Sequence, residues 1–197
     1  MDERRDPAMA ATWPEPHELA EVQYVSTPHP AVLAIDDLIT QCRLTSHRRG
    51  GPGGQHRNKV SSAIMALHQP SGISAEANER RDQSENRRVA LERLRIRLAI
   101  VLRSAIADPT QRSPGETQVR DRWSGRALKI GASNFDRSAV LALTLDDLHR
   151  AGGQPSLVAE RWKISTTSLV QFVASVPAAF QLLNHWRQHH GRAPLKA

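Results

Sequence analysis

The residues best suited to chemistry lie in a glycine-rich run flanked by basic side chains, over residues 48–59. Glycines tolerate positive φ and leave no side chain to obstruct the approach of the backbone to a ligand. The basic neighbours can hold such a bare loop on phosphates, so that a backbone amide and the side chain of Gln55 enter a narrow cleft lined by RNA. Neither Gly-Lys-Ser/Thr nor a helix-opening G-x-G-x-x-G is present here, which excludes the two familiar phosphate-binding glycine loops.

The positive charge of the chain is concentrated around this run. The 197 residues include 27 Lys and Arg and 20 Asp and Glu, a formal net charge of +7. Residues 43–103 hold 13 of these basic residues and 5 of the acidic ones, a net charge of +8, so the remainder has a net charge of −1. A concentrated excess of this kind is typical of a surface that binds nucleic-acid phosphates. The alternative is a solvated helix face rich in Arg.

Other features exclude several classes of protein. Apolar runs such as Leu98–Leu102 are far shorter than the roughly 20 residues that a bilayer span needs, so no membrane partner is expected. The acidic N-terminus is not followed by an apolar stretch, which argues against a secretory signal. The single cysteine, Cys42, fits a cytoplasmic protein. His185, His189 and His190 have helical spacing but no acidic or Cys partner nearby, so we expect no metal and no cofactor.

The sequence on either side of the glycine-rich run predicts the strands and helices of an α+β fold. A short helix is expected after Pro30, followed by strands over 43–47, 62–68 and 73–77, with the glycine-rich loop between the first two strands. The third strand alternates apolar and polar residues, which indicates a half-buried hairpin strand. A long helix follows, capped by Asp82 and Glu85 and ended by Asp108-Pro109.

The rest of the chain predicts a second, all-α unit. Helices are expected from a cap at Asn134 to Gly152-Gly153, over 155–162 and 166–175, and from Pro177 to His190. The resulting division is a flexible arm over 1–29, a small α+β catalytic unit over 30–107, a linker over 108–132 and a helical module over 133–197.

Gly53-Gly54-Gln55 in this setting resembles the catalytic loop of class I peptide chain release factors. The similarity continues in order through Asn58-Lys59 and His68 to Ile73, then through Arg81-Asp82-Gln83 and Asn86-Arg87-Arg88. It covers residues 40–104, about half of the chain. The resemblance implies the small sheet and long helix of the release-factor catalytic domain.

The resemblance implies hydrolysis of the ester that links a peptide to tRNA, in the peptidyl transferase centre of the ribosome. The catalytic residues would be Gly53, Gly54 and Gln55, and the partners large-subunit rRNA and peptidyl-tRNA. The Gln55 N–H would stabilise the developing oxyanion, while its side chain positions water. The residues expected to bind rRNA are Arg48, Arg49, His56, Arg57, Asn58, Lys59, Arg80, Arg81, Arg87 and Arg88. Arg57 stands where many members of that family have an aliphatic residue. We expect His56 to contact RNA rather than to act as a general base.

A second copy of the tripeptide, Gly152-Gly153-Gln154, lies in a different setting. It has no basic flanks and is followed by Pro155, so a glycine C-cap between two helices explains it.

Few residues precede the glycine-rich loop, which leaves no room for the codon-reading domain of full-length release factors. The expected activity is therefore codon-independent release, of the kind performed by stand-alone factors that rescue stalled ribosomes. One alternative is a ribosome- or RNA-binding factor without turnover. Another is a DNA-binding regulator, because residues 158–175 have helix-turn-helix spacing. DNA binding is disfavoured because the would-be recognition helix, 166–175, has neither Arg nor Lys.

Overall fold

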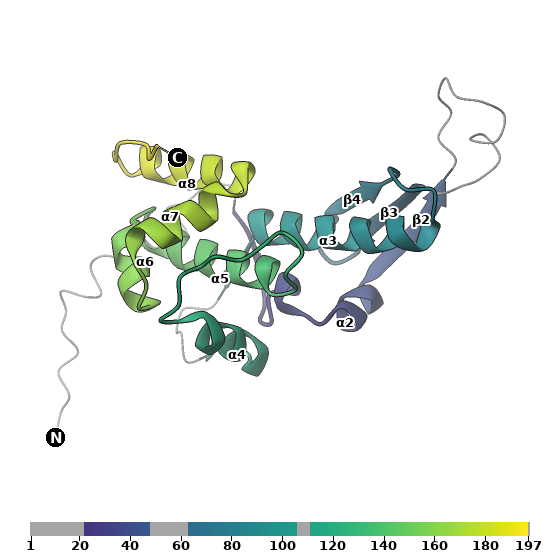
Figure 1. Ribbon diagram of the computed structural model, residues 1–197, viewed down its shortest axis with the longest axis horizontal. Helices are drawn as coiled ribbons and strands as arrows, with labels where there is room; N and C mark the ends of the chain where they lie inside the picture. Colours follow the sequence, from purple (N-terminus) through teal and green to yellow (C-terminus); the bar gives the residue numbers. More distant parts are fainter. Residues whose placement is uncertain (1–21, 48–62, 106–110, 197) are drawn as a thin grey trace.

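The computed structural model describes residues 22–47, 63–105 and 111–196. A small sheet lies at one end of the molecule and a group of helices at the other, and the long helix α3 (Gln83–Val101) reaches from one to the other (Figure 1). Within the described residues, no helix is both long and apolar enough to cross a membrane. The α+β class expected from the sequence is confirmed.

The sheet has three antiparallel strands, β2 (Cys42–His47), β3 (Ala63–His68) and β4 (Ser74–Ala77). All three agree with the predicted strands to within one residue. Ala75 and Ala77 of β4 are buried while Ser74 and Glu76 are partly exposed, which confirms the predicted alternation. The η2 turn (Pro30–Val32) and helix α2 (Ile35–Thr40) precede β2, so the predicted first helix is divided in two.

Helix α3 begins where the sequence indicated. The carboxylate of Asp82 accepts hydrogen bonds from the backbone N–H groups of Ser84 and Glu85, as expected of an N-cap. Leu91, Leu94 and Leu98 are buried, and α3 packs on β3, β4 and α5. The helix ends at Val101 instead of continuing to Asp108, because Leu102 turns into extended conformation and starts strand β5 (Leu102–Ser104).

Strand β5 pairs in parallel with β1 (Gln23–Val25), and this corrects the predicted flexible arm. The described part of that arm, from residue 22 onward, is built into the fold. The His29 ring is buried: its Nδ1 accepts from the Ala31 N–H at 3.0 Å, and its Nε2 lies 3.2 Å from the Leu102 carbonyl oxygen. Pairing between segments almost 80 residues apart leaves no local pattern in the sequence.

The predicted linker is also corrected, because helix α4 (Pro114–Trp123) forms within it. Ser113 and Glu116 make a capping box, and Pro114 occupies the first helical turn, where its missing N–H costs nothing. The Glu116 carboxylate is buried and accepts from the His29 N–H at 2.8 Å and from the Thr27 hydroxyl at 2.6 Å. The helix is thereby attached to the N-terminal segment.

Four further helices complete the fold: α5 (Arg137–Arg150), α6 (Pro155–Arg161), α7 (Thr166–Ala174) and α8 (Pro177–His189). Helix α5 starts two residues later than predicted, with Asp136 in place of Asn134 as the N-cap, because the Asn134 side chain accepts from the Asp136 N–H before the first helical turn. It is buried on nearly every side, as expected for the central helix of a layer. One cluster of buried residues runs from Leu38 and Ile64 near the sheet to Trp162 and Trp186 among the helices.

Candidate functional site

The hairpin of β2 and β3 presents the candidate catalytic loop at one end of the sheet. Its last pair joins His47 to Ala63, so residues 48–62 connect two strand ends that lie side by side. This segment lies outside the described residues, and with it Gly53, Gly54 and Gln55. The same holds for the predicted RNA contacts Arg48, Arg49, His56, Arg57, Asn58 and Lys59. Their roles remain predictions, whereas the strands that carry the loop are the ones expected.

The opposite end of the sheet is held by His68. Its Nδ1 lies 2.7 Å from the Ser71 hydroxyl and its Nε2 lies 3.1 Å from Gln41 Oε1, so one ring joins the β3–β4 turn to the residue before β2. The pKa of His68 lies below its ordinary value, mainly because the ring is buried and to a smaller extent because of the electrostatic effect of His29. The imidazole is therefore neutral at pH 7. Gly72 closes the turn at φ +71°, a conformation that favours glycine.

Asn86 fixes the connection between β4 and α3. It is fully buried, its Nδ2 donates to the Arg80 carbonyl at 2.9 Å, and its Oδ1 accepts from the Arg80 N–H at 3.0 Å. The amide side chain therefore mimics a strand neighbour for one residue of the connection. The sequence resemblance included Asn86 without indicating this positioning role.

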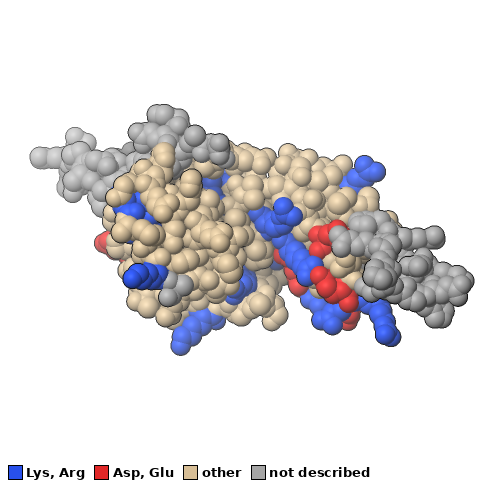
Figure 2. Space-filling view, turned by 90° about the horizontal axis from the view of Figure 1, so that it is seen from above, with Lys and Arg blue, Asp and Glu red and all other residues tan. Residues whose placement is uncertain are grey.

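The four described residues among the predicted RNA contacts are all exposed: Arg80, Arg81, Arg87 and Arg88. Arg80 lies 4.0 Å from Glu85, and Arg88 lies 2.6 Å from Glu92. Pairs this exposed contribute little to stability, so phosphates can compete for the guanidinium groups. Figure 2 shows Lys and Arg side chains mixed with Asp and Glu over the end that carries α3 and the sheet.

Arg87 lies near the base of the candidate loop. It borders a hollow of about 350 Å³ together with Thr45 and Ser46 of β2 and Gln83 and Ser84 of α3. Ser46 is the residue before the strand end at His47, so the first turns of α3 and the exit of β2 form one surface. The guanidinium group of Arg87 favours an anion at this surface.

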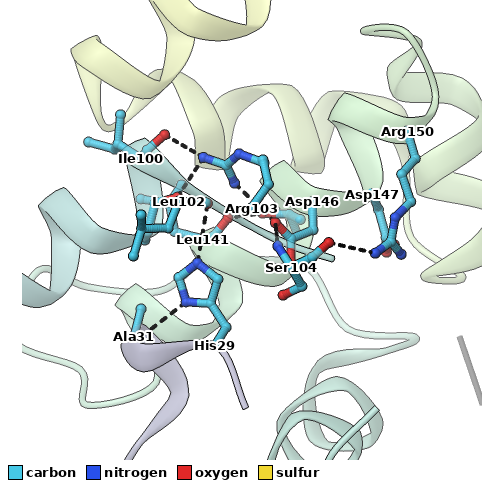
Figure 3. A network of polar contacts seen from close by, with 12 residues as sticks. His29, Ala31, Ile100, Leu102, Arg103, Ser104, Leu141, Asp146, Asp147 and Arg150 are labelled. Atoms are coloured by element: carbon cyan, nitrogen blue, oxygen red, sulfur yellow. Dashed lines mark hydrogen bonds and ion pairs between the residues drawn. The ribbon is translucent and has the colours of Figure 1, made fainter. Parts of the chain in front are cut away.

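Two arginines of the basic segment are buried and do not contribute to the exposed basic surface. Arg95 and Arg103 are 4% and 1% exposed. Arg103 donates to Asp146 at 3.2 Å and to the Ala99 carbonyl at 2.9 Å, and the same carboxylate oxygen accepts from the Ser104 N–H (Figure 3). Charge counting along the sequence therefore overstated the basic surface, because buried and exposed Arg are indistinguishable by type.

The helix-turn-helix alternative finds little support in the contacts of α7. The stretch 127–131 lies along this helix, where the Leu128 N–H donates to the Ser168 hydroxyl at 2.8 Å. Thr167, Ser168 and Gln171 border a groove shared with that stretch, and Thr167 and Gln171 are exposed. Of the small polar groups considered for reading base edges, the Ser168 hydroxyl is thus already bonded to another part of the chain.

The second glycine tripeptide is a helix terminus. Gly152 and Gly153 have φ values of +55° and +70°, and the Gly153 N–H donates to the Leu148 carbonyl at 2.8 Å, as in a Schellman motif. The Gly153 carbonyl in turn accepts from Arg187 of α8 at 2.7 Å. The structural interpretation of this copy is confirmed.

Gly153→Ala is expected to lower the free energy of unfolding by about 1–3 kcal/mol, because a non-glycine residue at positive φ is strained. The new Cβ would also lie 2.7 Å from Arg187 Cγ and 3.1 Å from the Arg187 backbone nitrogen. Urea denaturation measures the loss. Gly131→Ala is the matched control, since nothing lies within 4 Å of its Cβ position. Equal stability of the two variants would contradict a structural role for Gly153.

Comparison with known proteins agrees with this architecture. Residues 35–142, more than half of the chain, match the family described as RF-1 domain. The proteins named "Peptide chain release factor 1-like, mitochondrial" from Rattus norvegicus and Mus musculus are each 30% identical over 113 residues. The similarity covers 57% of this chain and 30% of each of those proteins, so it includes only a minor part of their length.

Proposed function

Because the chain belongs to the family of class I peptide chain release factors that share the RF-1 domain, we propose that it hydrolyses the peptidyl-tRNA ester on the ribosome. The observation that carries this proposal is the β2–β3 hairpin. Its paired ends, His47 and Ala63, are the two points from which the segment that contains Gly53-Gly54-Gln55 leaves the sheet. A loop supported in this way can enter a narrow RNA cleft without exposing the core.

The proposed chemistry requires no ionisable side chain at the reacting centre. The Gln55 N–H donates to the oxyanion, or to the departing ribose oxygen, as negative charge develops there. The Gln55 side chain positions the attacking water and excludes larger nucleophiles. Gly53 and Gly54 allow the backbone to aim that amide.

Docking in this proposal is electrostatic. The basic side chains of residues 48–59 hold the loop on rRNA phosphates. Arg80 and Arg81, before α3, and Arg87 and Arg88, in its first turns, extend the contact. Arg87 supports this arrangement because it borders the exit of β2. Binding to the ribosome accordingly weakens as the salt concentration rises.

The proposed release is independent of the codon. Stop-codon reading needs contacts deep in the decoding centre, some tens of ångströms from the peptidyl ester. In the described ranges, the helices and strands share one buried cluster and leave no separate unit for decoding.

We expect comparable release rates on ribosomes that have a stop codon, a sense codon or no codon in the decoding site. Single-turnover release of labelled peptide from the three complexes measures this, with the downstream mRNA truncated so that it does not block docking. A strong preference for one stop codon would contradict codon independence. Binding without release on any complex would instead favour a non-catalytic ribosome-binding factor.

A further inference from the structure

A second site lies between α3 and the segment that leads into α5. Here the structure has a cavity of about 250 Å³. Its walls include the apolar side chains of Ile35, Leu91, Ile96 and Phe135, and its rim includes Arg88 and Arg137. Pockets for drug-sized ligands and cofactors usually enclose about 300–1,000 Å³. This cavity therefore suits a smaller group, such as a single aromatic ring system.

Phe135 and Arg95 give the cavity a specific chemistry. Phe135 is 54% exposed, an unusual state for a large apolar side chain, and the guanidinium carbon of Arg95 lies 4.3 Å from the centre of its ring. Arg95 is held in place because its Nη atoms donate to the carbonyls of Phe135 and Ala31, at 3.1 and 3.0 Å. Its Nε–H is buried and has no hydrogen-bond acceptor among the described residues. A ligand with an acceptor atom in the cavity would satisfy it.

The charges around the cavity favour an anion. Three of its lining residues, Arg88, Arg95 and Arg137, are cationic, and Glu92 is the one acidic residue among those that the structure places there. The Glu92 carboxylate is neutralised by Arg88 at 2.6 Å, in an exposed pair for which a phosphate can compete. Arg137 donates to the carbonyls of Ile130 and Ser175, so Arg88 is the more accessible cation of the two. Flat rings that stack on Phe and Arg, acceptor atoms on the ring edge and a phosphate attached nearby are together the features of a nucleotide.

We propose that this cavity binds the base of one unpaired RNA nucleotide, stacked on Phe135, with its phosphate near the exposed Arg88. The inference rests on the proposed function in taking ribosomal RNA as the natural source of that nucleotide. An apolar side chain from a ribosomal protein would be the competing occupant. It would leave the Arg95 Nε–H unsatisfied and would gain nothing from the excess of Arg.

Fluorescence anisotropy with a labelled hexaadenylate tests the site on the full chain, without ribosomes or peptidyl-tRNA. Phe135→Ala should weaken binding about 5- to 100-fold, the range typical of losing one stacked base. Phe135→Tyr should bind like the wild type. Val101→Ala, which truncates another exposed apolar residue outside the cavity, should have no effect. Urea denaturation checks that each variant is folded.

A photoreactive benzoylphenylalanine at position 135 then identifies the occupant on purified ribosomes. We expect cross-links to rRNA. Cross-links to ribosomal protein alone, no binding of hexaadenylate by the wild type, or equal binding by the wild type and Phe135→Ala would each overturn the proposal. Release is measured separately. Failure of release together with intact Phe135-dependent binding would reject the proposed function alone. Normal release without Phe135-dependent binding would reject this site alone.

Discussion

Peptide release is expected to fall by about 10²-fold or more when Gln55 is replaced by alanine, while binding to the ribosome stays close to that of the wild type. The substitution removes the side chain proposed to position water, and small errors in positioning cost about this much. Gly54→Ala should cost about 10²–10³-fold, because it redirects the amide that stabilises the oxyanion. Single-turnover release and ribosome pelleting measure the two effects.

The chain supplies its own control for this experiment. Gln154 follows the same two glycines, but they form the terminus of α5 and lie against α8. Gln154→Ala should therefore release peptide at the wild-type rate. Equal losses from the two glutamines, or a loss of ribosome binding that matches the loss of release, would contradict the assignment of the active loop.

The largest effect on stability is expected at Asp147, a fully buried carboxylate of α5. It accepts hydrogen bonds from Arg112 at 2.8 Å, from Arg120 at 2.6 Å and from the Trp162 indole N–H at 2.7 Å. Asp147→Ala would leave two largely buried guanidinium groups without a counter-ion, which typically costs about 3–5 kcal/mol. Urea denaturation at neutral pH measures this cost. Asp121→Ala, at an exposed position of α4, should cost almost nothing.

The same network predicts how stability depends on pH. Burial by itself raises the pKa of Asp147, but Arg120 and Arg112 outweigh it, so the pKa in the folded protein lies below its ordinary value. The unfolded chain therefore binds the proton more readily. The stabilisation is complete above the ordinary Asp pKa of about 3.9 and is lost as the pH falls through the folded value.

Comparison with Asp147→Asn isolates this contribution, because every other carboxylate titrates equally in both proteins. The difference in free energy of unfolding between them should shrink between pH 7 and pH 3. A difference that stays constant over this range would show that the charge of Asp147 is not what stabilises the fold.

Local sequence pattern determined much of this protein. The Asp82 cap and the glycine terminus at Gly152-Gly153 each depend on neighbours a few residues away, and the extents of β2, β3 and β4 follow from the local pattern of residue types. Periodicity and capping chemistry report on such neighbours directly. The bounds of α6, α7 and α8 were predicted to within a residue for the same reason.

Tertiary structure alone decided which of the basic residues are exposed. Arg80 and Arg88 stay exposed, whereas Arg95 and Arg103, on the same basic stretch, are buried against segments far away in the chain. The parallel pairing of β1 with β5 and the attachment of α4 to His29 through Glu116 are of the same kind. Each of these contacts joins residues that lie 40 or more positions apart in the chain. The type of a side chain does not encode the identity of so distant a partner.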